Sequence, residues 1–192
     1  GGTKLDFGAF SAPQVLPGKY VVKLTVKDKV FYDSLNLIHV DEKNYKLEDR
    51  LLQNEISMKL YHLHESLAKC VDNINVEQNF IKENKAKLKS KKNIELAEKY
   101  YNQLEDLRST LLATKQKSIF ADEKKLREDI SETYSVVLSG LQRPSNMVIE
   151  STEELGHRVE NATNQYQSIK STNRLKFEKA LQKEKIILQP KP

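Results

Sequence analysis

Two hydrophobic periods divide the chain. Residues 16–41 alternate apolar and polar positions, whereas apolar positions from about residue 47 onward recur every three or four residues. The first pattern is typical of a half-buried β-strand and the second of an amphipathic helix. The change near Asp41 therefore predicts a β segment over residues 1–42 and a helical domain over residues 43–192.

The β segment has the composition of one antiparallel hairpin. Pro17 and Gly18 are turn-forming residues, and Tyr20 lies in a strand rich in β-branched and aromatic side chains. After a polar interruption, a second strand should run to about Val40, and a weak additional strand is expected around residues 5–10. An isolated hairpin is marginally stable in water. We therefore expect the hairpin to be part of a larger Ig-like or fibronectin-like sheet, or to lie on the helices.

The helical pattern divides into four amphipathic helices. Asn93 is expected to be the N-cap of the second helix, Gly140 to close the third, and Pro144 to open the fourth. Short connections place neighbouring helices antiparallel. The predicted fold is therefore mainly α, an up-down-up-down antiparallel four-helix bundle with an N-terminal β-hairpin. We expect helices over about 47–90, 93–117, 126–141 and 144–185.

The apolar stripes of these helices define a candidate core. The stripe of the first helix follows the four-three spacing of a bundle seam and is interrupted only near Glu77. Tyr101 belongs to the stripe of the second helix and Met147 to that of the fourth. The expected core comprises Ile56, Leu60, Leu63, Leu67, Ile74, Leu104, Leu111, Val137, Val159 and Tyr166.

Composition narrows the possible functions. Charged residues make up 31% of the chain and tryptophan is absent, which favours long solvated helices over a deep enzyme core. The 32 basic and 27 acidic side chains are interspersed along the sequence and give a net charge of +5, so we expect no nucleic-acid partner. No apolar run approaches the roughly 18 residues that cross a bilayer, so we expect no membrane-spanning segment.

The candidates for chemistry are weak. His62, His64 and Glu65 are close in sequence, but helical residues two positions apart point about 200° apart, so no zinc site is expected. Adjacent carboxylates fall near predicted helix N-termini, where they interact favourably with the helix dipole. The lysine run 82–92 is interpreted as a solvated helix end rather than a phosphate-binding patch. With no phosphate loop or nucleophile motif, we expect neither an enzyme nor a cofactor.

Three sequence features point to a family. Residues 17–24 carry the strand motif Pro-Gly-x-Tyr-x-Val-x-Leu, residues 47–53 form an acidic helix start with leucine and glutamine, and residues 144–145 resemble a Pro-Thr turn. In this order they resemble the C-terminal region of large bacterial proteins built on sortilin-like or BNR-repeat β-propellers, described as glycosyl-hydrolase- or sialidase-like. The family's second strand ends in Asp-Pro-Arg, whereas this chain has Asp-Glu-Lys at residues 41–43.

The resemblance implies a function and a location. It implies a non-catalytic C-terminal accessory module of a larger exported protein, with upstream domains of the same polypeptide as partners and an extracytoplasmic site. The chain begins at Gly1 without methionine, and we expect further domains upstream. No catalytic residue of the family maps onto this chain. The alternative is a free-standing helical bundle that binds a protein partner or forms a homo-oligomer through an exposed apolar stripe.

Overall fold

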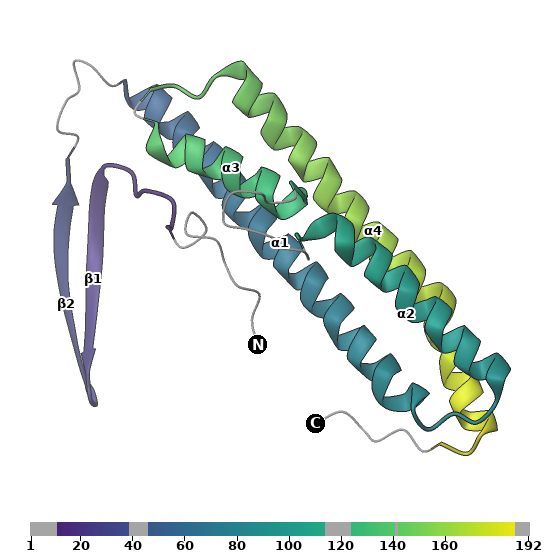
Figure 1. The fold of residues 1–192 in the computed structure, drawn as a ribbon. Helices are drawn as coiled ribbons and strands as arrows, with labels where there is room; N and C mark the ends of the chain where they lie inside the picture. The colour runs from purple at the N-terminus through teal and green to yellow at the C-terminus, as the bar shows by residue number, and fades with distance from the viewer. Residues whose placement is uncertain (1–10, 39–45, 114–123, 141, 187–192) are drawn as a thin grey trace.

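The computed structural model describes residues 11–38, 46–113, 124–140 and 142–186. The predicted fold class is confirmed, because the described chain is mainly helical, with four helices and an N-terminal antiparallel hairpin (Figure 1). The elements are β1 (Gly18–Val26), β2 (Lys29–Leu37), α1 (Leu47–Lys85), α2 (Lys91–Leu111), α3 (Leu126–Ser139) and α4 (Asn146–Lys183).

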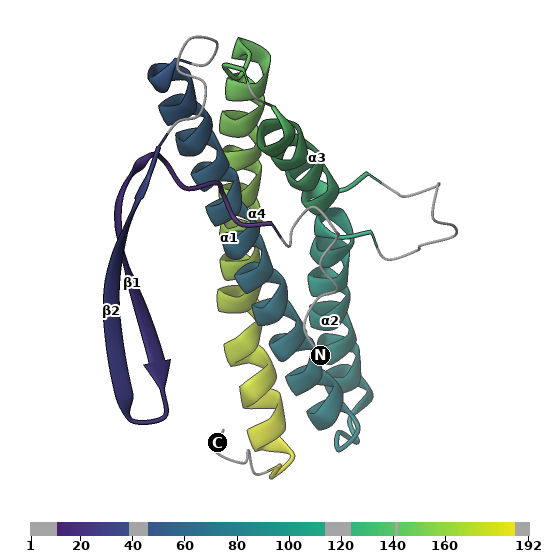
Figure 2. The ribbon, with the colours of Figure 1, turned by 90° about the vertical axis from the view of Figure 1, so that its left-hand side faces the viewer.

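Helices α2 and α3 lie end to end beside the two long helices (Figure 2). The Lys85 ammonium at the end of α1 donates to Glu98 near the start of α2, at 2.6 Å, and the Arg108 guanidinium near the end of α2 donates to Asn75, ten residues earlier in α1, at 3.1 Å. The Gln53 side chain near the start of α1 donates instead to the Val137 carbonyl of α3, at 2.6 Å. Both short helices therefore run antiparallel to α1 and in the same direction as each other.

This arrangement corrects the expected up-down-up-down order of the bundle. We expected α2 to continue to about Lys117, which would leave a short connection and an antiparallel neighbour. Instead α2 ends at Leu111 and α3 begins at Leu126. The longer connection imposes no tight helical hairpin. Together, α2 and α3 extend along most of the length of α1 and α4. We expected α1 and α4 to extend beyond the shorter pair instead.

The predicted core residues lie mainly in the bundle interior. Nine of the ten are at most 4% exposed, and Leu63 is half-buried at the edge of the core. Tyr100 is fully buried instead of Tyr101, and Met147 is 76% exposed, contrary to expectation. Full burial of a large apolar side chain contributes about 1.5–3 kcal/mol. The buried members of the predicted set are Ile56, Leu60, Leu67, Ile74, Leu104, Leu111, Val137, Val159 and Tyr166.

The strands pair in a continuous register. Val26 pairs with Lys29 across a two-residue loop, and Lys27 in this loop has a positive φ of 53°. Positive φ is the conformation that tight hairpin loops require. β2 ends at Leu37, short of the expected Val40. The weak strand expected around residues 5–10 lies outside the described residues.

The N-terminus of α2 is capped from α4. The prediction of Asn93 as N-cap is wrong, because Ser90 occupies that position and Asn93 lies inside the helix. The Glu184 carboxylate accepts the backbone N–H groups of Lys89 and Ser90, at 2.6 and 3.2 Å, and the Asn93 amide at 2.6 Å. The Lys89 backbone bond, with the Asn93 bond, lowers the pKa of Glu184. An acidic side chain thus satisfies donors that the helix leaves open.

We expect Glu184→Gln to lower stability at neutral pH and to change the response to acid. A carboxyl group with a lowered folded-state pKa contributes stability above its unfolded pKa of about 4.3. That contribution is lost as the pH falls through the lowered folded-state pKa. The urea midpoints of the parent and variant should therefore differ at neutral pH and converge in acid. Glu83→Gln, at an exposed position of the same end, is the control.

Candidate functional site

One face of the hairpin is apolar. Paired residues of antiparallel strands point to the same face. The register places Tyr20 opposite Leu35 and Leu24 opposite Phe31. The other face carries a different set of side chains, including Lys23 and Ser34. We define the apolar face by its seven apolar side chains, and Lys29 and Asp33 lie on the same side, opposite Val26 and Val22. The seven are Tyr20, Val22, Leu24, Val26, Phe31, Leu35 and Leu37.

The apolar face is open to solvent in the described part of the chain. Leu24 is 58% exposed and Phe31 is 52% exposed. The two strands contact each other extensively but pack little against the helices, and the hairpin stands beside the bundle in both views (Figures 1 and 2). The expected larger sheet is not formed by the described residues. A contiguous exposed apolar face of this kind marks an interaction surface.

A short segment attaches the hairpin to the bundle. We call residues 11–16 the strap. The Tyr134 hydroxyl of α3 donates to a strap carbonyl at 2.7 Å. Arg50 and Asn54 of α1 both donate to Gln14, to its side-chain and backbone oxygens respectively, each at 2.8 Å. The strap therefore crosses two helices and positions the start of β1 relative to them.

The predicted turn residues lie at the junction of strap and hairpin. Pro17 lies at a bend and Gly18 begins β1. The Tyr20 hydroxyl donates to the Leu16 carbonyl at 2.6 Å, which ties the first residues of the strand back to the strap. Tyr20 thus has two roles, since its ring belongs to the apolar face while its hydroxyl fastens the junction.

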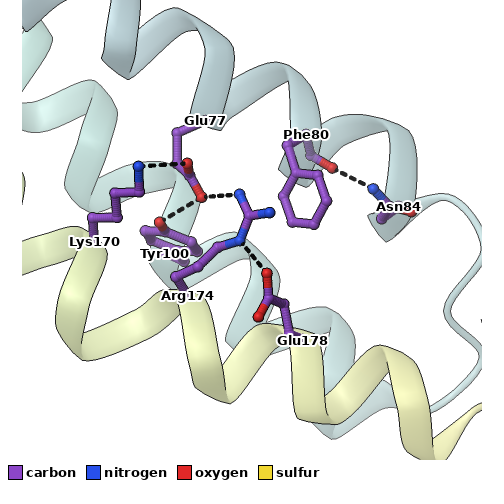
Figure 3. Close-up of polar contacts among 7 residues, drawn as sticks. All are labelled: Glu77, Phe80, Asn84, Tyr100, Lys170, Arg174 and Glu178. Atoms are coloured by element: carbon purple, nitrogen blue, oxygen red, sulfur yellow. Dashed lines mark hydrogen bonds and ion pairs between the residues drawn. The ribbon is translucent and has the colours of Figure 1, made fainter. Parts of the chain in front are cut away.

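A buried polar cluster joins α1, α2 and α4 (Figure 3). Glu77, only 2% exposed, accepts from the Tyr100 hydroxyl at 2.8 Å and from the Arg174 guanidinium at 2.6 Å. Lys170 lies 3.9 Å from the other oxygen of Glu77, and Arg174 also donates to Glu178 at 2.6 Å. A buried carboxylate is costly without such partners. We call these five residues the Glu77 cluster.

The Glu77 cluster is suited to packing rather than to reaction chemistry. The face of the Arg174 guanidinium lies over the Phe80 ring, 3.6 Å from the ring centroid, while its N–H groups donate to the carboxylates. Burial, with the hydrogen bond to Glu77 and its charge, raises the pKa of Tyr100, which keeps the phenol protonated as a donor. Sequence reasoning did not identify the cluster, although Glu77 interrupted the apolar seam.

His62, His64 and Cys70 do not converge on a site. His62 lies 3.0 Å from Glu65, whereas the His64 ring packs edge to face against Tyr134. Cys70 is buried, and burial raises the pKa of its thiol. Among the residues that the structure describes, no group of three or more His, Cys, Asp or Glu side chains is placed to hold a metal ion.

Comparisons of the chain with protein-family models, with curated proteins and with solved structures found no match. Within the described ranges, no helix has the length and apolar character needed to cross a membrane. The apolar face of the hairpin is therefore the principal candidate site.

Proposed function

We propose that the chain is a non-catalytic C-terminal accessory module of a larger exported β-propeller protein. In this proposal the bundle is a rigid support, and the hairpin completes a β-sheet of the preceding domain. The exposed apolar face is the observation that carries the proposal. Seven apolar side chains on one side of a two-stranded sheet require a second layer to be buried, and the outer strand edges, which no other described residue pairs, can accept further strands.

The size of the apolar face favours a covalently linked partner. Nine-residue strands at about 3.3 Å per residue, two strands wide, give a footprint of roughly 300 Å². Stable complexes between separate chains commonly bury about 800 Å² on each partner. A domain of the same polypeptide needs less contact area, because linkage supplies a high effective concentration. The apolar face thus fits a neighbouring domain better than a second copy of this chain.

The sequence resemblance supports the same assignment. The strand motif at residues 17–24 forms β1, and its apolar positions Tyr20, Val22 and Leu24 belong to the apolar face. The proposal places the module outside the cytoplasm and any propeller-borne activity upstream of Gly1. The upstream reading frame should then encode a signal peptide and propeller repeats. A start codon immediately before Gly1 would contradict this assignment.

We expect the double substitution Leu24→Ser with Phe31→Ser to destabilise the polypeptide extended by its upstream reading frame by about 2–4 kcal/mol, because burial of both side chains is lost. In the 192-residue chain the same variant should change stability by less than about 0.5 kcal/mol, since both residues are exposed there. Urea unfolding measures both effects. Val21→Ser with Tyr32→Ser, on the opposite face of the same hairpin, is the matched control.

Two results would oppose the docking proposal. Equal stability of the two extended variants would show that the apolar face is not buried by the upstream domain. A concentration-dependent dimer of the 192-residue chain, abolished by Leu24→Ser with Phe31→Ser but not by the control, would favour the alternative of a self-associating helical protein.

A further inference from the structure

The fold gathers positive charge at one end of the bundle. The connection between α1 and α2 meets the C-terminal end of α4 there, where Glu184 accepts hydrogen bonds from Lys89 and Ser90 (bottom of Figure 2). We call residues 81–99 and 174–186 the basic tip. It holds twelve basic and five acidic side chains, a net charge of +7, whereas the whole chain has +5. The rest of the chain is therefore slightly acidic.

Most lysines of the basic tip are free to act on a partner. Three of the five acidic side chains already have partners, since Glu98 pairs with Lys85, Glu178 with Arg174, and Glu184 caps α2. Ten lysines are exposed, and they come from α1, α2, α4, the connection between α1 and α2, and the residues that follow α4. They are Lys82, Lys87, Lys89, Lys91, Lys92, Lys99, Lys176, Lys179, Lys183 and Lys185.

A surface hollow opens on the side of the basic tip. It has a volume of about 440 Å³ and lies between α1 and α2. Lys82, Tyr101 and Asn102 line it together with the Lys85–Glu98 ion pair, and the Lys82 ammonium lies 5.1 Å from the centre of the Tyr101 ring. Because Glu98 neutralises Lys85, the Lys82 ammonium and the Asn102 amide are the donors that this hollow offers to a small anionic group.

The type of cation and the shape of the basic tip favour a membrane over nucleic acid. The exposed cations are all lysines, which act as point charges, and the one arginine, Arg174, is directed into the Glu77 cluster. Within the described residues the basic tip and its hollow expose no aromatic ring on which a base could stack fully, since Tyr101 of the hollow is partly buried and Phe177 wholly so. Lysines around the blunt end of a rod can instead approach a flat anionic surface together.

We propose that the basic tip binds the surface of a bilayer that contains anionic phospholipids, with a phosphate headgroup occupying the hollow. Clusters of four to eight basic side chains suffice for such attraction. Taken by itself, the lysine run 82–92 is typical of a solvated helix end and does not indicate a binding surface. The lysines of α4, brought to the same place by the fold, complete the surface. The proposal is independent of the hairpin and does not rest on the proposed function.

The test is sedimentation of the 192-residue chain with phosphatidylcholine vesicles that contain or lack phosphatidylglycerol. We expect binding only to the anionic vesicles, and weakening as the salt concentration rises. Replacing Lys91, Lys92, Lys179 and Lys183 with glutamine should lower the partition coefficient roughly 1,000-fold. The same four positions changed to arginine should retain binding. Glutamine at the four lysines of the hairpin, residues 19–29, removes equal charge at a distance and should retain binding.

Several outcomes would overturn the membrane proposal. These are binding to neutral vesicles, an equal loss in the tip and hairpin glutamine variants, or a DNA oligonucleotide bound under conditions in which anionic vesicles are not. Circular dichroism of the glutamine variants should match that of the parent, because all substituted lysines are exposed.

Discussion

Replacement of Glu77 by leucine should destabilise the bundle by about 3–5 kcal/mol, because it leaves a charged Arg174 and the Tyr100 hydroxyl without their buried acceptor. Thermal and urea unfolding followed by circular dichroism measure the change. Glu77→Gln, which keeps a hydrogen-bond acceptor but loses the charge, should have a smaller effect. Glu83→Leu, at an exposed position of the same helix, should have almost none.

A double substitution measures how much of this loss comes from the Arg174 charge, which keeps only its ion pair with Glu178 when Glu77 is replaced. Glu77→Leu with Arg174→Met replaces the charged pair by apolar side chains of similar size. Such replacement of a buried ion pair is often neutral or stabilising. We therefore expect the double variant to recover part of the stability that Glu77→Leu loses, since the Tyr100 hydroxyl still lacks its acceptor. A loss of less than about 0.5 kcal/mol in Glu77→Leu would show that the cluster does not hold α1, α2 and α4 together.

Leu67→Asp should abolish cooperative folding of the bundle. Leu67 is 2% exposed in the seam of α1, so the substitution removes apolar burial and places a carboxylate in the core without a partner. The combined cost is about 4–5 kcal/mol or more, a large part of the 5–15 kcal/mol stability of an ordinary domain. Val76→Asp, at an exposed position of the same helix, is the control. Retained helicity and melting temperature in Leu67→Asp would contradict the assigned core.

The elements were predictable where one local period dominates the sequence. Alternation located both strands, and the four-three spacing located the helices and most of the core. The same periods did not determine which of two adjacent apolar residues is buried. Tyr100 and Tyr101 differ by about 100° around α2, and tertiary packing selected Tyr100. Asn93 has the chemistry of an N-cap, but Glu184 from a distant helix satisfies the α2 terminus and uses Asn93 as a further donor.

The direction of α3 and the two polar features depend on contacts between distant segments. Nothing local in residues 126–139 distinguishes a helix that reverses beside α2 from one that continues beyond it. Glu77 was visible as a break in the apolar seam, but its partner Arg174 is 97 residues away. The charge at the basic tip was likewise invisible in sequence order, because the lysine run 82–92 and the lysines of α4 meet only in the fold.

For the hairpin, the sequence pattern predicted more burial than the described chain provides. Its pattern predicted a face to be buried, and the described chain leaves that face exposed. The prediction that it belongs to a larger sheet or lies on the helices is not met by the described residues themselves. The apolar face therefore carries the proposed function, since a pattern that specifies burial without a local partner indicates a partner elsewhere.

Hydrogen exchange of the β1 and β2 amides, compared between the 192-residue chain and the polypeptide extended by its upstream reading frame, tests the docking of the hairpin most directly. We predict rapid exchange of the outer-edge amides in the 192-residue chain, and strong protection of residues 18–37 in the extended polypeptide. The amides of α1 should be equally protected in both and provide the internal reference. Unchanged, rapid exchange of the outer-edge amides of β1 and β2 in the extended polypeptide would contradict the account.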